Sequence, residues 1–136
     1  MIYLTRIEHF NAAHRLFRSD RSDEENLRVF GKCAYPNWHG HNYELHVTVK
    51  GIPSPETGFV CNAKLLSTII GEVILEKVDH RNLNLDVDFL QGLIPSAENV
   101  AQAIWNELQP HITSLGAELH SVRLWETPRI CAECSA

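Results

Sequence analysis

Long apolar runs and clusters of one charge sign are both missing from this sequence. No stretch approaches the ~18 consecutive apolar residues of a membrane-spanning helix. The first residues, Met1 to Arg6, have neither the basic start nor the apolar block of a signal peptide. The formal net charge is −5 without a basic cluster, which argues against a nucleic-acid or anionic-membrane surface. We therefore expect a cytoplasmic protein whose partners are small molecules or further copies of itself.

Cysteine is sparse and scattered, with four residues in the chain. This distribution is not that of a disulfide framework, and cytosolic thiols stay reduced. Cys131 and Cys134 have the C-x-x-C spacing of zinc sites and redox pairs, but no second pair accompanies them, so we assign them no role. Cys61 is most simply a small buried hydrophobe. Cys33 remains as the candidate for chemistry.

The pattern of apolar residues predicts a single α+β domain over residues 1–136. A chain of 136 residues with 44% hydrophobic content is long enough for one core and short for two. The order strand, strand, helix, helix, strand, strand predicts a four-stranded antiparallel sheet with both helices on one face. The predicted strands are about 2–13, 41–51, 117–127 and 130–133, and the helices 63–78 and 97–109. Two exposed sheet edges lead us to expect oligomerisation.

Both predicted helices have a cap and an apolar stripe. Asn62 can cap the first helix, and Gly71 within it costs about 1 kcal/mol relative to Ala, which suggests close packing there. Ser96 can cap the second, with Glu98 in the first turn, where the helix dipole favours a carboxylate. Pro110 is expected to stop this helix. The stripe of the first helix comprises Leu65, Leu66, Ile69, Ile70, Val73 and Ile74.

A long polar excursion, residues 17–32, separates the first two predicted strands, and we expect it to carry one helical turn. Loops longer than ~12–15 residues in a small domain are usually functional or disordered. Because this one leads to Cys33, we favour function.

Three histidines have the spacing of a metal site. Apolar and polar residues alternate from Tyr43 onward, and His41 and His39 continue the apolar face of this strand toward its start. Gly40 between them leaves room for a ligand or for another backbone. His14 ends the first predicted strand. A catalytic zinc usually takes three protein ligands and leaves a fourth position open, so we predict a catalytic Zn²⁺ at these histidines. Alternatively, His39 and His41 are solvated loop residues and His14 is a hydrogen-bonded histidine at a strand end.

The thiol of Cys33 becomes a candidate base or nucleophile if zinc, Lys32 or a carboxylate-paired histidine removes its proton. Asp79 and His80 offer such a pair, because an aspartate can fix the tautomer of an imidazole. An adjacent Asp-His at a helix end is also common as a solvated cap.

Glu126 shares a strand phase with Val122 and Leu124, which places its carboxylate on the covered face of the sheet. A buried charge needs a partner. That partner is either an Arg of the protein or a ligand edge that offers two N–H donors to one carboxylate.

Several motifs occur in a specific order and spacing: residues 10–16, 23–27, 30–33, 36–43, 79–83, 98–101 and 125–127. Together they resemble the 6-pyruvoyl-tetrahydropterin synthase family over essentially the whole chain. The resemblance implies the tunnelling fold (ββααββ), in which trimeric β-barrels stack into hexamers with active sites between subunits. It implies Zn²⁺ at His14, His39 and His41, catalysis by Cys33, Asp79 and His80, and substrate binding by Glu126, Thr127, Ser96 and Glu98.

The reaction implied by the resemblance converts 7,8-dihydroneopterin triphosphate to 6-pyruvoyl-tetrahydropterin, with loss of triphosphate and no external redox cofactor, on the route to tetrahydrobiopterin. We hypothesise, from charge and position, that Arg15 and Lys32 meet the triphosphate. The sequence departs from the family at Trp38, where Gly is common, and at Ala97, where Thr or Ser usually helps to hold the pterin.

Two alternatives remain. The related 6-carboxytetrahydropterin synthases of queuosine biosynthesis use the same substrate and residue set but also release acetaldehyde. The five residues between Cys33 and His39 resemble the pyruvoyl-forming branch instead. The second alternative is a non-catalytic module that binds a pterin or purine.

Overall fold

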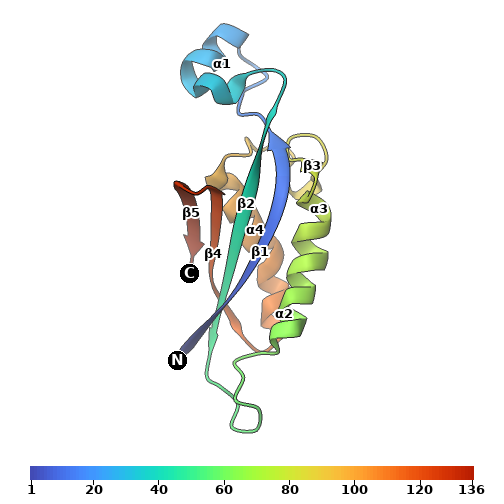
Figure 1. Cartoon of the computed structure of the whole chain (residues 1–136), viewed down its shortest axis with the longest axis vertical. Helices are drawn as coiled ribbons and strands as arrows, with labels where there is room; N and C mark the ends of the chain where they lie inside the picture. Colours follow the sequence, from blue (N-terminus) through green and yellow to red (C-terminus); the bar gives the residue numbers. More distant parts are fainter.

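The sheet has five strands in the computed structural model, which describes residues 1–136. They are β1 (Ile2–His14), β2 (His39–Gly51), β3 (Arg81–Asn82), β4 (Glu118–Thr127) and β5 (Ile130–Ser135). The strand order is β3-β1-β2-β4-β5, and all neighbours are antiparallel except β3, which runs parallel to β1. Figure 1 shows β1 and β2 as the long central strands.

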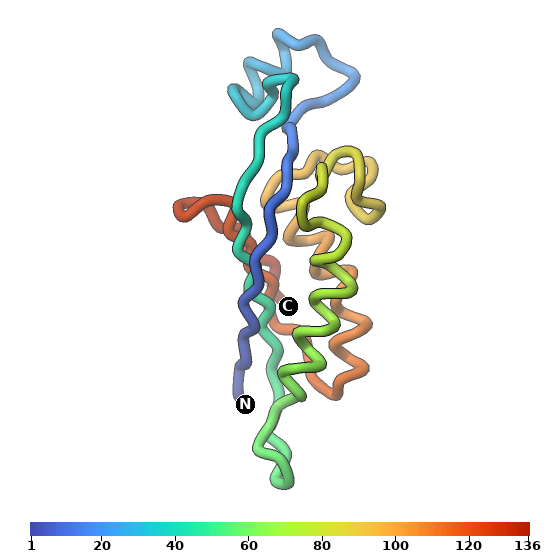
Figure 2. Tube along the Cα trace, turned by 45° about the vertical axis from the view of Figure 1, so that its right-hand side comes forward, coloured from blue at the N-terminus to red at the C-terminus, as the bar shows by residue number.

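Two helical segments cover one face of the sheet, as predicted (Figure 2). The first is α2 (Ala63–Ile70), continued by a π-helical turn, η2 (Gly71–Leu75), and by α3 (Glu76–Val78); the second is α4 (Ala97–Thr113). A short 3₁₀ turn, η3 (Asp88–Leu90), lies in the connection between them. No helix of the structure has the length and apolar character needed to cross a membrane.

The core lies between the sheet and these helices, where the strand alternation predicted it. Leu45, Val47 and Val49 of β2 are fully buried, and so are Leu66 and Ile70 of α2. Alternate residues of a strand point to opposite faces, so the same alternation that buries these side chains leaves the other face of the sheet open.

Four predictions of local structure were wrong. The sheet has a fifth strand, β3, because two residues that follow Asp79-His80 pair with β1 without any alternation to reveal them. Leu65 is 50% exposed and lies outside the buried stripe. A Cβ atom at Gly71 would meet nothing within 4 Å, so no close packing requires this glycine. The second helix continues through Pro110 to Thr113, because its last turn buries Ile112.

The polar excursion folds into more than the one turn that was expected. It contains α1 (Asp23–Phe30), capped by the Ser22 side chain, followed by the 3₁₀ turn η1 (Gly31–Ala34). Figure 1 shows this segment standing beyond the end of the sheet, away from the other helices. Cys33 is therefore presented at the end where β1 finishes and β2 begins.

Candidate functional site

Three histidines converge at the end of the β1–β2 pair. His14 lies opposite His39 in the register, and His41 lies opposite Ala12. The ring centroid of His14 lies 4.6 Å from that of His39 and 5.0 Å from that of His41. One nitrogen from each of the three rings can be chosen such that all lie within 4.8 Å of one another. The structure thus brings together the predicted ligand set in an arrangement that can hold a metal ion.

The orientation of the His14 ring is set by the backbone of a distant residue. Its Nδ1 atom lies 2.8 Å from the carbonyl oxygen of Pro95, and because a carbonyl only accepts, Nδ1 carries the proton. The Nε2 atoms of His14 and His41 are buried without a hydrogen-bond partner. Since buried polar atoms are normally paired, these two nitrogens fit a metal ion as their missing partner.

Burial favours the neutral form of the His14 and His39 imidazoles. It lowers the pKa of His14 to about 4, with smaller contributions in the same direction from His39 and His41, while the Pro95 contact opposes the shift. Burial and the neighbouring His41 also lower the pKa of His39. A metal ligand must be deprotonated, so the folded protein holds the His14 and His39 rings in the neutral form that a metal ion requires.

Glu126 lies next to the histidines on the covered face. Its Oε1 atom is 3.6 Å from Nε2 of His41, and its side chain is 14% exposed. Burial raises the pKa of this carboxyl, His41 lowers it, and Glu98 raises it further. No Arg or Lys lies within ion-pair distance, so this chain does not supply the Arg partner that was one of the two alternatives.

Cys33 occupies η1 and is half-buried. Its carbonyl accepts a hydrogen bond of 2.8 Å from the Leu16 amide, which ties the cysteine turn to the residues after His14. Between Cys33 and His39 the chain passes through Trp38 with φ at 65°. Glycine adopts this left-handed conformation without steric cost, which gives a physical reason for the glycine common at this position in the resembled family.

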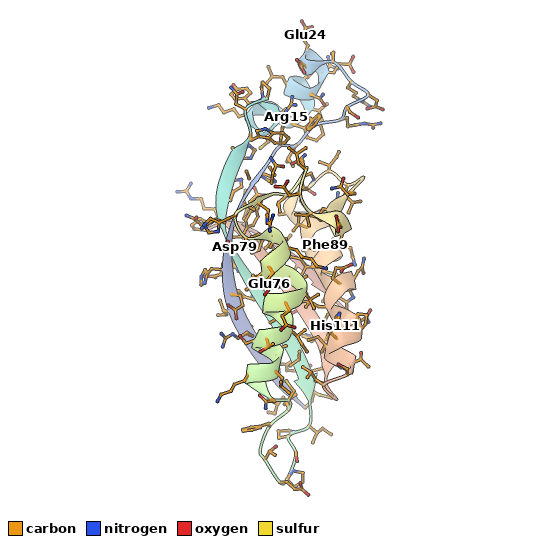
Figure 3. All side chains as sticks on the ribbon, turned by 90° about the vertical axis from the view of Figure 1, so that its right-hand side faces the viewer. Arg15, Glu24, Glu76, Asp79, Phe89 and His111 are labelled. Atoms are coloured by element: carbon orange, nitrogen blue, oxygen red, sulfur yellow. The ribbon has the colours of Figure 1, made fainter.

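The Asp79-His80 pair forms as predicted, but away from Cys33. His80 Nδ1 lies 3.0 Å from Oδ1 of Asp79, which also accepts from the Asn11 amide at 2.9 Å. That amide is the largest cause of the lowered pKa of Asp79, and His80 adds to it. No hydrogen bond or ion pair joins the pair to Cys33 in one chain. Figure 3 shows Asp79 at the end of α3, where it meets the sheet.

A polar hollow of 590 Å³ lies beside this pair. It is lined by His80, by Asn11 and Asn42 from the open face of the sheet, by Asn82 of β3 and by Asp86 from the loop after β3. His80 is exposed and has φ at 60°, a strained conformation for a residue other than glycine. The imidazole is therefore presented outward, toward whatever occupies the open face.

The other predicted substrate residues lie at two turns near Glu126. The Ser96 hydroxyl caps α4 by accepting from the Asn99 amide at 3.2 Å. The Thr127 hydroxyl accepts from the Arg129 amide at 3.1 Å in the β4–β5 turn. Glu98 is exposed in the first turn of α4. Both hydroxyls thus make local contacts through which they stabilise the turns around the carboxylate.

Sequence reasoning missed two groups of this site. Tyr43 is buried below the rings, with its hydroxyl 3.4 Å from Nδ1 of His14; its strand phase, shared with His41, was the available signal. The Pro95 carbonyl had no such signal, because 81 positions separate it from the imidazole that it orients.

Comparison with known proteins shows the family of this chain. The family model described as 6-pyruvoyl tetrahydropterin synthase matches residues 3–136. The chain belongs to this family. The 6-pyruvoyl tetrahydrobiopterin synthase of Homo sapiens is 45% identical over 118 residues, which cover 87% of this chain and 80% of the relative.

A solved relative has nearly the same fold. The structure of Caenorhabditis elegans 6-pyruvoyl tetrahydropterin synthase superposes with a TM-score of 0.92 at 36% identity, over 99% of this chain and 95% of that one. The 6-carboxy-5,6,7,8-tetrahydropterin synthase of Bacillus subtilis is more distant, with 29% identity over 88% of this chain and 75% of the relative. The chain is therefore more similar to the pyruvoyl-named members of its family.

Proposed function

We propose that this chain is a lyase that converts 7,8-dihydroneopterin triphosphate to 6-pyruvoyl-tetrahydropterin and eliminates triphosphate. The observation that carries the proposal is the convergence of three histidines beside a half-buried carboxylate that has no Arg or Lys partner, in a member of this family. The two features would bind different parts of one substrate. The carboxylate would bind the pterin ring, and the histidines would bind a metal ion that contacts the substrate side chain.

His14, His39 and His41 would hold Zn²⁺, consistent with the two unpaired Nε2 atoms and the preference of zinc for neutral imidazole. Zinc would supply Lewis acidity toward the hydroxyl groups of the substrate side chain. The Pro95 carbonyl keeps the proton of His14 on Nδ1 and so keeps Nε2 available.

Glu126 would bind the pterin. Its carboxylate can accept two N–H donors from the 2-amino group and the ring, in the paired geometry that makes charge-assisted hydrogen bonds strong. Ser96, Glu98 and Thr127 would border the same pocket.

Cys33 would move protons between the substrate side chain and the ring, with His80 as proton relay and Asp79 as the group that orients it. Because the Asp-His pair and Cys33 make no contact within one chain, we propose that His80 reaches the cysteine of a neighbouring copy. A homohexamer of two trimeric β-barrels, the tunnelling-fold assembly, would bring the two together. Two strand edges are unpaired in the sheet: the outer edge of β5 and the edge of β1 before Ala12. Both could pair with strands of neighbouring copies in such an assembly.

Product analysis by mass spectrometry tests the proposal. Zinc-loaded protein incubated with 7,8-dihydroneopterin triphosphate should yield 6-pyruvoyl-tetrahydropterin and triphosphate. Formation of 6-carboxytetrahydropterin with acetaldehyde would show the queuosine-pathway activity instead, which the identity to the Bacillus relative makes the second candidate. Binding without turnover would show a pterin-binding module.

A further inference from the structure

We propose that Arg15 is a positioning residue that fixes the Cys33 turn against the metal histidines, and that the side chain of Asn84 anchors it. This inference rests on the proposed function only for its effect on turnover. Figure 3 shows Arg15 at the base of the projecting α1 segment, where that segment joins the rest of the molecule.

The guanidinium of Arg15 is used within the chain. Its Nε atom donates to the carbonyl of Ala34 at 2.8 Å, and its Cζ atom lies 4.1 Å from the ring centroid of Phe17. The side chain is only 14% exposed, and its ion-pair contact, Asp23, is 3.8 Å away. This geometry favours a role for Arg15 in holding the Cys33 turn. It does not favour the contact with triphosphate that the charge of Arg15 suggested.

Two consecutive residues after His14 hold two consecutive carbonyls of the turn. Leu16 donates its amide to the Cys33 carbonyl at 2.8 Å, and Arg15 donates its Nε to the next carbonyl, that of Ala34. The two donors are the first and second residues after His14 in the sequence. Two hydrogen bonds therefore hold the Cys33 turn in a fixed position relative to His14. One is donated by the Leu16 backbone and the other by the Arg15 side chain.

The Asn84 amide holds the backbone of Arg15 in the manner of a strand partner. Its Oδ1 atom accepts from the Arg15 amide at 2.9 Å, and its Nδ2 atom donates to the Arg15 carbonyl at 2.9 Å. This extends the parallel pairing of β3 with β1, which continues through a 2.8 Å hydrogen bond from the Leu83 amide to the Ala13 carbonyl.

The segment after His80 and the Cys33 turn are therefore both held by the two residues that directly follow β1, Arg15 and Leu16. Arginine suits this junction because its planar guanidinium can donate a hydrogen bond and stack on an aromatic ring simultaneously, whereas the ammonium of lysine is a compact donor with different geometry. Without this contact the turn would keep only the Leu16 hydrogen bond, and we expect Cys33 to become more mobile and more accessible.

The test compares zinc-loaded wild-type protein with Arg15→Met, Arg15→Lys and Asn84→Ala. The first readout is the rate at which iodoacetamide alkylates Cys33, followed by peptide mass spectrometry at one pH. We expect alkylation about ten-fold faster in Arg15→Met, the scale of one charge-assisted hydrogen bond, less in Arg15→Lys, and faster than wild type in Asn84→Ala. Arg21→Met is the matched control, since Arg21 is exposed and its side chain makes no hydrogen bond.

The second readout separates positioning from substrate binding. Arg15→Met should lower kcat about ten-fold and leave KM within about two-fold. A raised KM with unchanged kcat would overturn the proposal in favour of a triphosphate contact. If Arg15→Met does not fold, the other two variants decide. A wild-type rate of Cys33 alkylation in folded Asn84→Ala or folded Arg15→Lys would then overturn the proposal. If wild-type protein shows no turnover, the proposed function fails, while the alkylation rates still decide the role of Arg15.

Discussion

The Nδ1 atom of His14 lies 2.8 Å from the carbonyl oxygen of Pro95 and thereby connects the end of β1 to the residues just before α4. Because the Pro95 carbonyl accepts from Nδ1–H, this contact fixes the tautomer of the ring and leaves the buried Nε2 atom unprotonated and without a hydrogen-bond partner. His14 is fully buried, whereas the other two rings are half-buried. The candidate metal site therefore has one rigid ligand and two that are nearer to solvent.

Replacing His41 with alanine should abolish metal binding. Three ligands hold a catalytic zinc, and two imidazoles leave it incomplete, so the zinc content of protein purified under zinc-replete conditions should fall from about one ion per chain to near zero. Elemental analysis measures this directly. His111→Ala, at an exposed position in α4, should keep the wild-type content. Full zinc occupancy in His41→Ala would contradict the site.

Acid should destabilise the metal-free protein through His14. Its pKa is lowered from 6.5 to about 4 in the folded state, so between these values the unfolded chain binds a proton that the folded chain does not. The free energy of unfolding therefore falls as the pH decreases from 6.5 toward 4, by about 2 to 3 kcal/mol for this residue. Urea titrations of chelator-treated protein at pH 7 and pH 4.5 should show a smaller loss in His14→Asn. An equal loss in both proteins would disprove the assignment.

Removing the thiol of Cys33 should eliminate turnover without unfolding the protein. The side chain makes no hydrogen bond and is half-buried, so Cys33→Ala should retain the wild-type melting temperature and zinc content. A proton-transferring group contributes about 10²- to 10⁴-fold to rate, and kcat should drop by this factor. Cys131→Ala, an exposed position on β5, should turn over normally. Activity retained in Cys33→Ala would exclude its role.

Neutralising Glu126 should weaken pterin binding selectively. Glu126→Gln keeps the shape of the side chain but removes the charge that strengthens two hydrogen bonds, so the dissociation constant of a pterin should rise about 10- to 100-fold. Titration followed by pterin fluorescence measures it. Glu118→Gln is the control, since Glu118 pairs with Lys50 at the opposite end of β4. An unchanged affinity would show that the ring binds elsewhere.

Alanine at position 71 should stabilise the fold. Gly71 has φ −59° and ψ −54°, values accessible to alanine, and a Cβ atom there meets nothing within 4 Å. The substitution restricts the unfolded chain and should add about 0.4 to 1 kcal/mol to the free energy of unfolding, measured by urea titration. Gly116→Ala, at φ +79°, should be destabilising. A destabilised Gly71→Ala would indicate that the π-helical turn depends on glycine.

Much of the metal site could be predicted from local periodicity. His39 and His41 continue the buried phase of Tyr43, and the structure confirms that all three lie on the covered side of β2, with His14 opposite His39. Alternation within a strand is a local property that can be read from neighbouring residues. Assigning it one residue out of phase would have placed every side chain on the opposite face. The same reasoning placed Glu126 on the covered face, and the structure adds that its carboxylate lies 3.6 Å from His41.

Local sequence patterns were sufficient to predict the alternating core, the helix caps at Asn62 and Ser96, and the three histidines, because each depends on neighbours within a few residues. Three other features emerge only once the chain is folded: Pro95 orients His14, Asn84 continues β3 along Arg15, and Asp79 and His80 lie apart from Cys33. These contacts join positions far apart in the chain through backbone carbonyls and amides. Every residue carries such groups, so residue type alone gives no sign of which ones will meet.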